Sequence, residues 1–347
     1  MFDKTIVITT PGTSLSVDSS HFTLRSAGKR IGRIPPTMIR QMIVHHGVEV
    51  TQAAMERISA LGVPLTFLNR EGRISSRLCP PWRNDPAPRL EQARAHLDFH
   101  TRLLLARRWV DAKLANAAAV ISRHASNYPD PALLRAAAKI RKIRSRAAQC
   151  KSIDRLMGYE GAAGRTYFSV FNRMLRAGWA EFTGRNRRPP RDPVNALLSY
   201  TYAILANELQ ALIEGVGLDP YIGFLHGSAS RRASLALDLM EPFRPVLADR
   251  LCLRLINLGT LKPEHFQDNL PQPGILLTRD GRLAVLDAVV PWSDQCDDTL
   301  STSLNSPRGL LTREVERLAA AAKGNLSSFR PFYLLPEDIE KCPALEP

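Results

Sequence analysis

The stretch CPPWRNDPAPR (79–89) divides the chain, because it places four prolines within eleven residues. Proline fixes φ and lacks a backbone N–H, so clustered prolines interrupt both helix and sheet. Before this stretch the sequence is rich in β-branched and alternating residues, and after it in alanine and leucine. We therefore expect residues 80–89 to be a linker between two domains of different class.

Residues 1–79 are predicted to form a small β-rich domain. Short segments with β-branched or alternating residues are bounded by Gly and Pro, a pattern typical of strands. The expected strands are TIVIT (5–9), SLSVDSSHFTLRS (14–26), the MIVHHGVEV region (42–50), and a hairpin of PLTFLN (64–69) and ISSRL (74–78) around REGR (70–73). TQAAMERISALG (51–62) is expected to be a helix that ends at Gly62.

Residues 90–347 are predicted to form a larger, mainly α-helical domain, although the part from 274 onward is harder to assign. An aspartate followed by proline is a strong helix start, and this pair occurs at Asp130 and Asp192. We expect helices over 90–125, from 130, from 192 to Gly215, over 231–258 and over 312–324, and a hairpin over 274–290 around Asp280-Gly281. The fold class is therefore α+β: a small β-rich domain joined by a Pro-rich linker to a mainly α-helical domain.

Composition limits the class of partner. The chain has 47 Lys+Arg against 33 Asp+Glu, a formal net charge of +14. An excess of this size favours a polyanionic partner, most often nucleic acid, although some proteins are simply basic. The five cysteines are scattered without a C-x-x-C pair, which argues against a zinc ribbon or a disulfide framework. With no signal-peptide pattern and no membrane-spanning run, we expect a cytoplasmic protein without a membrane partner.

The stretch GFLHGSASRRASLALDLMEPFRP (223–245) places polar residues where the pattern calls for apolar ones. Asp238 and Glu241 are three residues apart, so they share one face of a helix, and His226 precedes them in a glycine-flanked loop. One histidine with two carboxylates suits Mg²⁺ or Mn²⁺ better than structural zinc. The alternative is that the acids pair with Arg231, Arg232 or Arg244 and that the histidine is a hydrogen-bonded core residue.

A further acid, Glu160, lies in MGYEGAAGRTYFSVF (157–171), where small residues allow close approach of a ligand. Arg165 and Tyr167 follow at spacings suited to facing a phosphate. The alternative for Glu160 is an acid in the first turn of a helix. Basic segments at 135–155, 184–191 and 231–232 bracket these acids in sequence. Acids ringed by arginine are suited to metal-assisted phosphodiester chemistry.

Several of these segments together resemble the CRISPR-associated adaptation integrase ("Cas one") family. They are YEGAAGRTYF (159–168), RRPPRDPVNALLSYTYAIL (187–205), GFLHG (223–227), SLALDLMEPFRP (234–245) and LKPEHF (261–266). Their order and approximate spacing match, and the similarity covers roughly residues 1–270. Residues 274–306 depart from the family's usual pattern, so the resemblance implies nothing about that segment.

The resemblance implies a homodimer formed through the N-terminal domains, and the small "Cas two" protein and double-stranded DNA as partners. It also implies an integrase and endonuclease in which a protospacer 3′-hydroxyl attacks a phosphodiester at a CRISPR repeat boundary, and which acts on branched DNA. The implied ligands of Mg²⁺ or Mn²⁺ are Glu160, His226 and Glu241, with Asp238 as a further candidate. The candidate DNA contacts are Arg165, Arg187, Arg188, Arg231, Arg232, Arg244, Asn195 and Tyr200. Alternatives are a transposon-associated integrase of the same family and an inactive DNA-binding scaffold.

Overall fold

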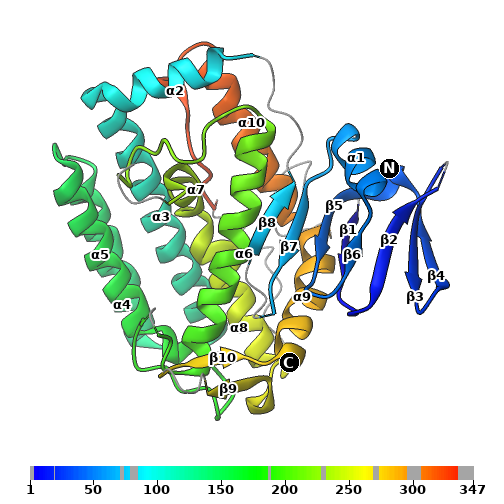
Figure 1. The fold of residues 1–347 in the computed structure, drawn as a ribbon. Coiled ribbons are helices and arrows are strands. Elements are labelled where there is room, and N and C mark those ends of the chain that lie inside the picture. Colours follow the sequence, from blue (N-terminus) through cyan, green and yellow to red (C-terminus); the bar gives the residue numbers. More distant parts are fainter. Residues whose placement is uncertain are drawn as a thin grey trace. The chain divides into compact units, whose positions relative to one another are not determined.

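The structure is a computed structural model, and it describes residues 4–18, 20–70, 74–78, 85–186, 189–227, 232–268, 273–294 and 306–334. The chain divides into two units, Met1–Asn84 and Asp85–Pro347. The first is β-rich and the second mainly helical (Figure 1), so the predicted α+β class is confirmed. Of the expected linker, residues 80–84 lie outside the described part of the chain. Residues 87–89 are already helical, so the predicted linker was too long.

The first unit contains two four-stranded sheets and a helix, α1 (Gln52–Ala60). One sheet has the order β1-β5-β7-β8 and the other β4-β3-β2-β6. The strands are β1 (Lys4–Ile8), β2 (Thr13–Val17), β3 (Phe22–Ser26), β4 (Lys29–Ile34), β5 (Ile39–Val44), β6 (Glu49–Val50), β7 (Leu65–Leu68) and β8 (Ile74–Leu78). Helix α1, the strand near 5–9 and the β7–β8 hairpin are confirmed. The stretches expected as strands over 14–26 and 42–50 each contain two, β2 with β3 and β5 with β6.

Strand β4 was not predicted. Its sequence, KRIGRI, leaves most side chains exposed, so it has no alternating apolar face to reveal it. It forms because it pairs antiparallel with β3, which contributes the fully buried Phe22 to the core. That core also contains Leu15, Met42 and Ile58. Pairing with a neighbour, rather than local sequence, determines this strand.

The second unit is built mainly from helices, and capping side chains fix where several of them start. Asp98, Asp130 and Asp192 each accept a hydrogen bond from an N–H in the first turn of the helix that follows, which satisfies one otherwise unpaired donor. The helices are α2 (Ala87–Leu97), α3 (Phe99–Asn127), α4 (Pro131–Ala147), α5 (Ile153–Ser169), α6 (Pro193–Gly215), α7 (Ser234–Met240), α8 (Arg250–Asn257), α9 (Arg279–Asp294) and α10 (Pro307–Lys323). Within the described residues, none of them combines the length and apolarity needed to span a membrane.

Helix α3 is the centre of this unit. It packs against α4 and α5 on one side (Figure 1) and also contacts α7 and a short π-helical stretch, η4 (Arg244–Asp249). Its buried alanines allow close approach of neighbouring helices, and Trp109 and Ile121 fill the space between them. Segments distant in sequence therefore meet along α3.

Two predicted helices are interrupted. The run over 90–125 breaks at Asp98, which has extended backbone and caps α3. The run over 231–258 divides into α7, η4 and α8, because Pro242 and Pro245 lack the N–H that a continuous helix needs. The second break turns the chain immediately after Glu241.

The predicted hairpin over 274–290 is wrong. Strand β10 (Ile275–Leu277) pairs instead with β9 (Phe266–Asp268), and Asp280-Gly281 lies in the first turn of helix α9. A Cβ atom on Gly281 would lie 2.4 Å from the carbonyl oxygen of His265. The glycine is therefore explained by close packing of α9 on the preceding segment rather than by a tight turn.

This packing predicts that Gly281→Ala lowers the free energy of unfolding by about 1–3 kcal/mol, because backbone must shift to admit the methyl group. Gly158→Ala is the matched control, since a Cβ atom there meets nothing within 4 Å in helix α5. We expect that control to stabilise the protein by about 0.5–1 kcal/mol. Urea titration measures both, and equal effects of the two substitutions would contradict the packing explanation.

Candidate active site

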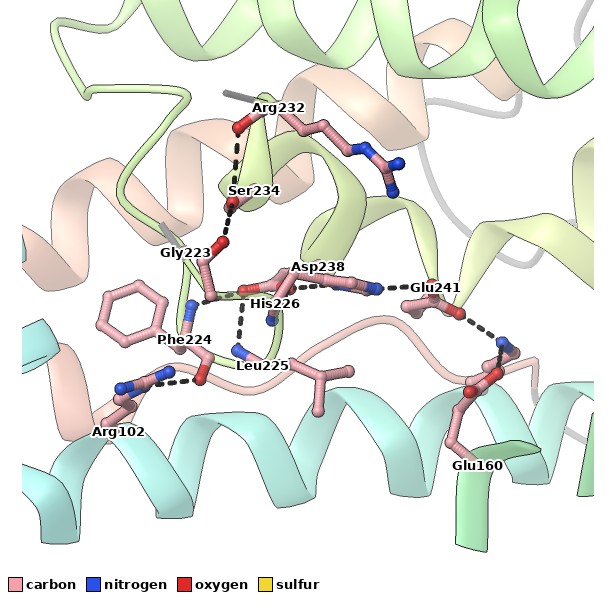
Figure 2. Close-up of polar contacts among 12 residues, drawn as sticks. Arg102, Glu160, Gly223, Phe224, Leu225, His226, Arg232, Ser234, Asp238 and Glu241 are labelled. Carbon is pink, nitrogen blue, oxygen red and sulfur yellow. Dashed lines mark hydrogen bonds and ion pairs between the residues drawn. The ribbon is translucent and has the colours of Figure 1, made fainter. Parts of the chain in front are cut away.

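The carboxylate of Asp238 on helix α7 organises the loop that carries His226. Asp238 Oδ2 accepts hydrogen bonds from the N–H groups of Phe224 at 2.5 Å and Leu225 at 2.9 Å. Its Oδ1 accepts one from the N–H of His226 at 3.0 Å. Asp238 is fully buried, and these amides offset the cost of removing its charge from water (Figure 2).

Gly223 allows this loop to reach α7. A Cβ atom at this position would lie 2.7 Å from Cβ of Ser234 and 2.9 Å from Asp238 Oδ2. From the other side, Arg102 Nε on α3 donates to the carbonyl oxygen of Phe224 at 3.0 Å. The loop is therefore held between α3 and α7, and any side chain at position 223 would separate it from Asp238.

The imidazole of His226 is oriented by the same carboxylate. Its Nδ1 lies 2.7 Å from Asp238 Oδ1, and because a carboxylate only accepts, Nδ1 carries the proton. Burial lowers the pKa of His226, but the hydrogen bond from Nδ1 to Asp238 and the nearby carboxylate charges raise it more, so the net shift is upward. In the neutral ring Nε2 is left with a free lone pair, 4.0 Å from Glu241 Oε1. A histidine held in this way is arranged as a metal ligand is.

Glu241 lies where α7 ends and is 2% exposed. Its Oε1 is 3.1 Å from Nη2 of Arg244, and its Oε2 forms an ion pair with Nζ of Lys113. Burial acts to raise the pKa of Glu241, but the charges of Arg244 and Lys113 outweigh it and lower the pKa to about 2. Glu241 is therefore ionised at neutral pH. The ion pair with Arg244 is one that the sequence left open as an alternative.

Glu160 comes from a different helix, α5, and its Oε1 forms an ion pair with the same Lys113 ammonium. It lies in the middle of α5, which begins at Ile153, so the alternative of an acid in a first helical turn is excluded. Figure 2 shows Glu241 between the His226–Asp238 pair and Glu160. The three predicted ligands are thus brought into one group, through Lys113 and through the 4.0 Å approach of His226 Nε2 to Glu241.

Lys113 was missed by the sequence analysis. Its side chain on α3 is 14% exposed, and its ammonium bridges Glu160 and Glu241. The signal was present: Lys113 lies one turn from the buried Trp109 and one turn from the buried Ala117, so it interrupts an apolar helix face. A charged residue on such a face needs a partner of opposite charge.

A cavity of about 420 Å³ adjoins this group. Glu160 and Lys113 line it together with three arginines, Arg165, Arg185 and Arg244. Tyr167, Tyr202 and Asp249 also line it. Tyr202 donates its hydroxyl to Asp249 Oδ1 at 2.6 Å, and burial raises the pKa of Asp249 to about 6 despite that hydrogen bond. The cavity therefore combines cationic groups with hydrogen-bonding groups beside the acids.

The remaining predicted DNA contacts differ in position. Arg165 is exposed at the cavity and Arg232 is exposed next to α7. Asn195 is fully buried, where its amide binds Arg185, the backbone at 184 and 186, and Asp192, so it holds a loop and has no surface for DNA. Tyr200 packs against the helical core, and burial raises its pKa to about 12. Arg187, Arg188 and Arg231 lie outside the described residues.

The donor set fits a divalent cation. Two carboxylates and an imidazole nitrogen are ligands that Mg²⁺ and Mn²⁺ accept, and the gap between the acids already holds a positive group, the Lys113 ammonium. Within the described residues, no three His, Cys, Asp or Glu side chains stand together in ligand geometry, since both acids close on Lys113 instead. Asp238 has both oxygens occupied by the loop and by His226, so it is a poor candidate for direct ligation.

The whole chain is similar to known proteins in sequence and in fold. A CRISPR-associated endonuclease Cas1 from Rhodospirillum rubrum is 35% identical over 95% of this chain and 98% of its own length. A CAS1 protein from Thermotoga maritima has a structure with a TM-score of 0.77 at 25% identity, covering 92% of this chain and 97% of that one.

Two further solved structures share the fold, each with a TM-score of 0.77 at 23% identity. One is a chain of a Cas6-RT-Cas1–Cas2 complex, matched over 96% of this chain and 36% of that one. The other is a casposase bound to integration product, matched over 98% of this chain and 96% of that one. The family model for CRISPR associated protein Cas1 matches residues 6–290, which cover most of both units and every described residue of the site. The chain therefore belongs to the Cas1 family of CRISPR-associated endonucleases.

Proposed function

We propose that this protein is a metal-dependent DNA integrase and endonuclease of CRISPR adaptation. The observation that carries the proposal is the convergence of Glu160, His226 and Glu241 beside a cavity lined by arginines. The acids suit a cation and the arginines suit phosphates. Membership of the Cas1 family supports the same conclusion.

The proposed reaction is a transesterification. The 3′-hydroxyl oxygen of a short DNA fragment bonds to a phosphorus at a CRISPR repeat boundary, and the bond from that phosphorus to the existing 3′ oxygen breaks. The attacking hydroxyl loses a proton and the leaving oxygen gains one, so no oxidant or covalent protein intermediate is needed. The reverse reaction resolves branched DNA, and water in place of the hydroxyl gives an endonuclease.

Each side chain has a proposed part in this reaction. Glu160, Glu241 and Nε2 of His226 would hold Mg²⁺ or Mn²⁺, and the bound cation would polarise the phosphate and lower the pKa of the attacking hydroxyl. Asp238 fixes the tautomer and direction of His226 without ligating. Arg165 faces the DNA backbone, whereas Arg244 holds Glu241 from behind.

The proposed partners follow from charge and from the family. A formal net charge of +14 suits double-stranded DNA, both fragment and repeat. A Cas2 protein is proposed as a partner because a chain of the same fold occurs in a Cas6-RT-Cas1–Cas2 complex. We also propose that the first unit mediates a homodimer. The protein is proposed to act in the cytoplasm, with no membrane partner.

Substitution His226→Ala should reduce strand transfer at least about 100-fold, because a metal ligand is lost. The assay joins a 3′-hydroxyl DNA fragment to a plasmid with a CRISPR array, in Mg²⁺ or Mn²⁺ and in EDTA. His100→Ala is the control, since His100 is exposed at the start of α3. Full activity of the His226 variant, or activity in EDTA, would contradict the three-ligand site.

Substitution Asp238→Asn should weaken Mn²⁺ binding about 10- to 100-fold, as is typical when the group that orients a histidine ligand is changed. The NH₂ group that replaces one carboxylate oxygen can only donate, so it would lose the hydrogen bonds that this oxygen accepts from the 224–226 loop or from the His226 ring. Electron paramagnetic resonance of free Mn²⁺ measures the affinity, and melting temperature in EDTA reports whether the loop still packs. Unchanged affinity in a folded variant would show that Asp238 does not act through His226.

DNA affinity should fall steeply with salt, because phosphate contacts release counterions. Arg165→Ala should reduce the slope of log affinity against log salt by about 1 without changing Mn²⁺ affinity. Arg57→Ala on α1 makes the same change in charge and serves as the control. A salt-independent affinity would argue against a partner bound through its phosphates.

A transposon integrase is a second candidate, because a casposase shares this fold. The strand-transfer assay separates the two. Insertion at CRISPR repeat boundaries supports adaptation, whereas selective use of fragments with terminal inverted repeats supports transposition. DNA binding without metal-dependent strand transfer would identify an inactive scaffold.

A further inference from the structure

Lys113 contacts two of the proposed metal ligands but has no part in the proposed reaction. It projects from the middle of α3, which packs against both α5 and the η4 stretch. Its ammonium forms ion pairs with one oxygen of Glu160 and one oxygen of Glu241. Those two acids come from different helices, so Lys113 links α5 to the end of α7.

Two carboxylates that face one gap repel each other strongly when partly removed from water. Arg244 neutralises Glu241 from one side, through Oε1. The opposite oxygen, Oε2, is turned toward Lys113 and away from Arg244. Because Lys113 is ion-paired to both acids, it stabilises the close approach of Glu160 and Glu241 without a metal, in addition to the charge of Arg244.

A divalent cation and the Lys113 ammonium cannot share this gap, because their like charges would repel at contact distance. Lysine is a point charge on a flexible four-carbon stem, so it can leave without a change in the backbone. The cavity of about 420 Å³ beside it, which Lys113 itself lines, gives room for this movement. Arg165, the proposed contact to the DNA backbone, lines the same cavity, so a displaced Lys113 would lie in the cavity that Arg165 lines.

We propose that Lys113 is a built-in competitor of the metal: it holds Glu160 and Glu241 together in the metal-free protein and must be displaced into the adjoining cavity when a divalent cation binds. The inference rests on the proposed metal site. It assigns to Lys113 a positioning part, because Lys113 acts through the two acids. It also means that the metal-free site is assembled but has a reduced affinity for the cation.

The first test compares Lys113→Met with wild type. Removing the competitor leaves more negative charge on the ligands, so Mn²⁺ affinity should rise on the order of tenfold. In EDTA the variant should melt at a lower temperature, because the acids repel without a cation, and Mn²⁺ should raise its melting temperature more than that of wild type. Lys139→Met, at an exposed position on α4, is the control for the loss of one charge. Equal or weaker Mn²⁺ affinity in the Lys113 variant would overturn the proposal.

The second test uses the wild-type protein and does not depend on a variant folding. Lysines are acylated with a water-soluble amine reagent, with and without Mn²⁺, and the modification of each is measured by mass spectrometry. Lys113 should react slowly without metal and several-fold faster with it, whereas Lys139 should not change. A Lys113 rate that is unchanged or lower with Mn²⁺ would overturn the proposal.

The two proposals fail in different ways. If wild type binds no Mn²⁺, or if Glu160→Gln and Glu241→Gln leave its affinity unchanged, the proposed metal site itself is wrong. If those two variants lose Mn²⁺ but Lys113→Met does not gain affinity, the metal site stands and only the competitor is wrong.

Discussion

The hydrogen bonds of the Asp238 carboxylate are the constraint on which the site depends. A buried carboxylate needs several donors, and here three consecutive backbone N–H groups and one imidazole N–H supply them. These bonds fix the 224–226 loop against α7 and direct Nε2 of His226 toward Glu241. The absence of a side chain at Gly223 is a condition of the same contact. The charge of one acid thus sets the position of the other functional groups.

Helix α3 supplies the second half of the framework. Arg102 holds the loop before His226, Lys113 binds the acids, and Nδ2 of the buried Asn116 donates to the carbonyl oxygen of Pro242 at 2.8 Å. Helix α7 ends just before Pro242, and the hydrogen bond from Asn116 fixes the backbone at this turn. Helix α3 therefore contacts the loop before His226, helix α5 at Glu160 and the chain at 241–242. Functional side chains keep a precise geometry when rigid elements of this kind support them.

Sequence could predict the residues whose signal is local. The Asp-Pro helix starts at Asp130 and Asp192 need only capping chemistry, and polar residues in LALDLMEPF contradict the apolar pattern around them. It could not predict β4, which forms through pairing with β3, nor α9, whose glycine at position 281 is explained by a contact with His265. Asn195 was assigned to DNA because its helix carries family motifs, yet burial and its hydrogen bonds are tertiary properties. Lys113 gave a signal, but its partners lie 47 and 128 residues away, too far for spacing to join them.

The balance of charge explains why the site needs both Arg244 and Lys113. Arg244 is buried over the Tyr202 ring, 5.0 Å from its centroid. Burial acts to lower the pKa of Arg244, but Glu241 and the other nearby acidic groups outweigh it and raise the pKa, so Arg244 is a permanent cation. It keeps Glu241 ionised and, like Lys113, lines the cavity of about 420 Å³. Lys113 also lines the cavity, but it is held through a flexible stem by its contacts with the two acids. In the proposed exchange, Arg244 stays paired with Glu241 while the metal displaces Lys113, so the acids keep a cation beside them in either state.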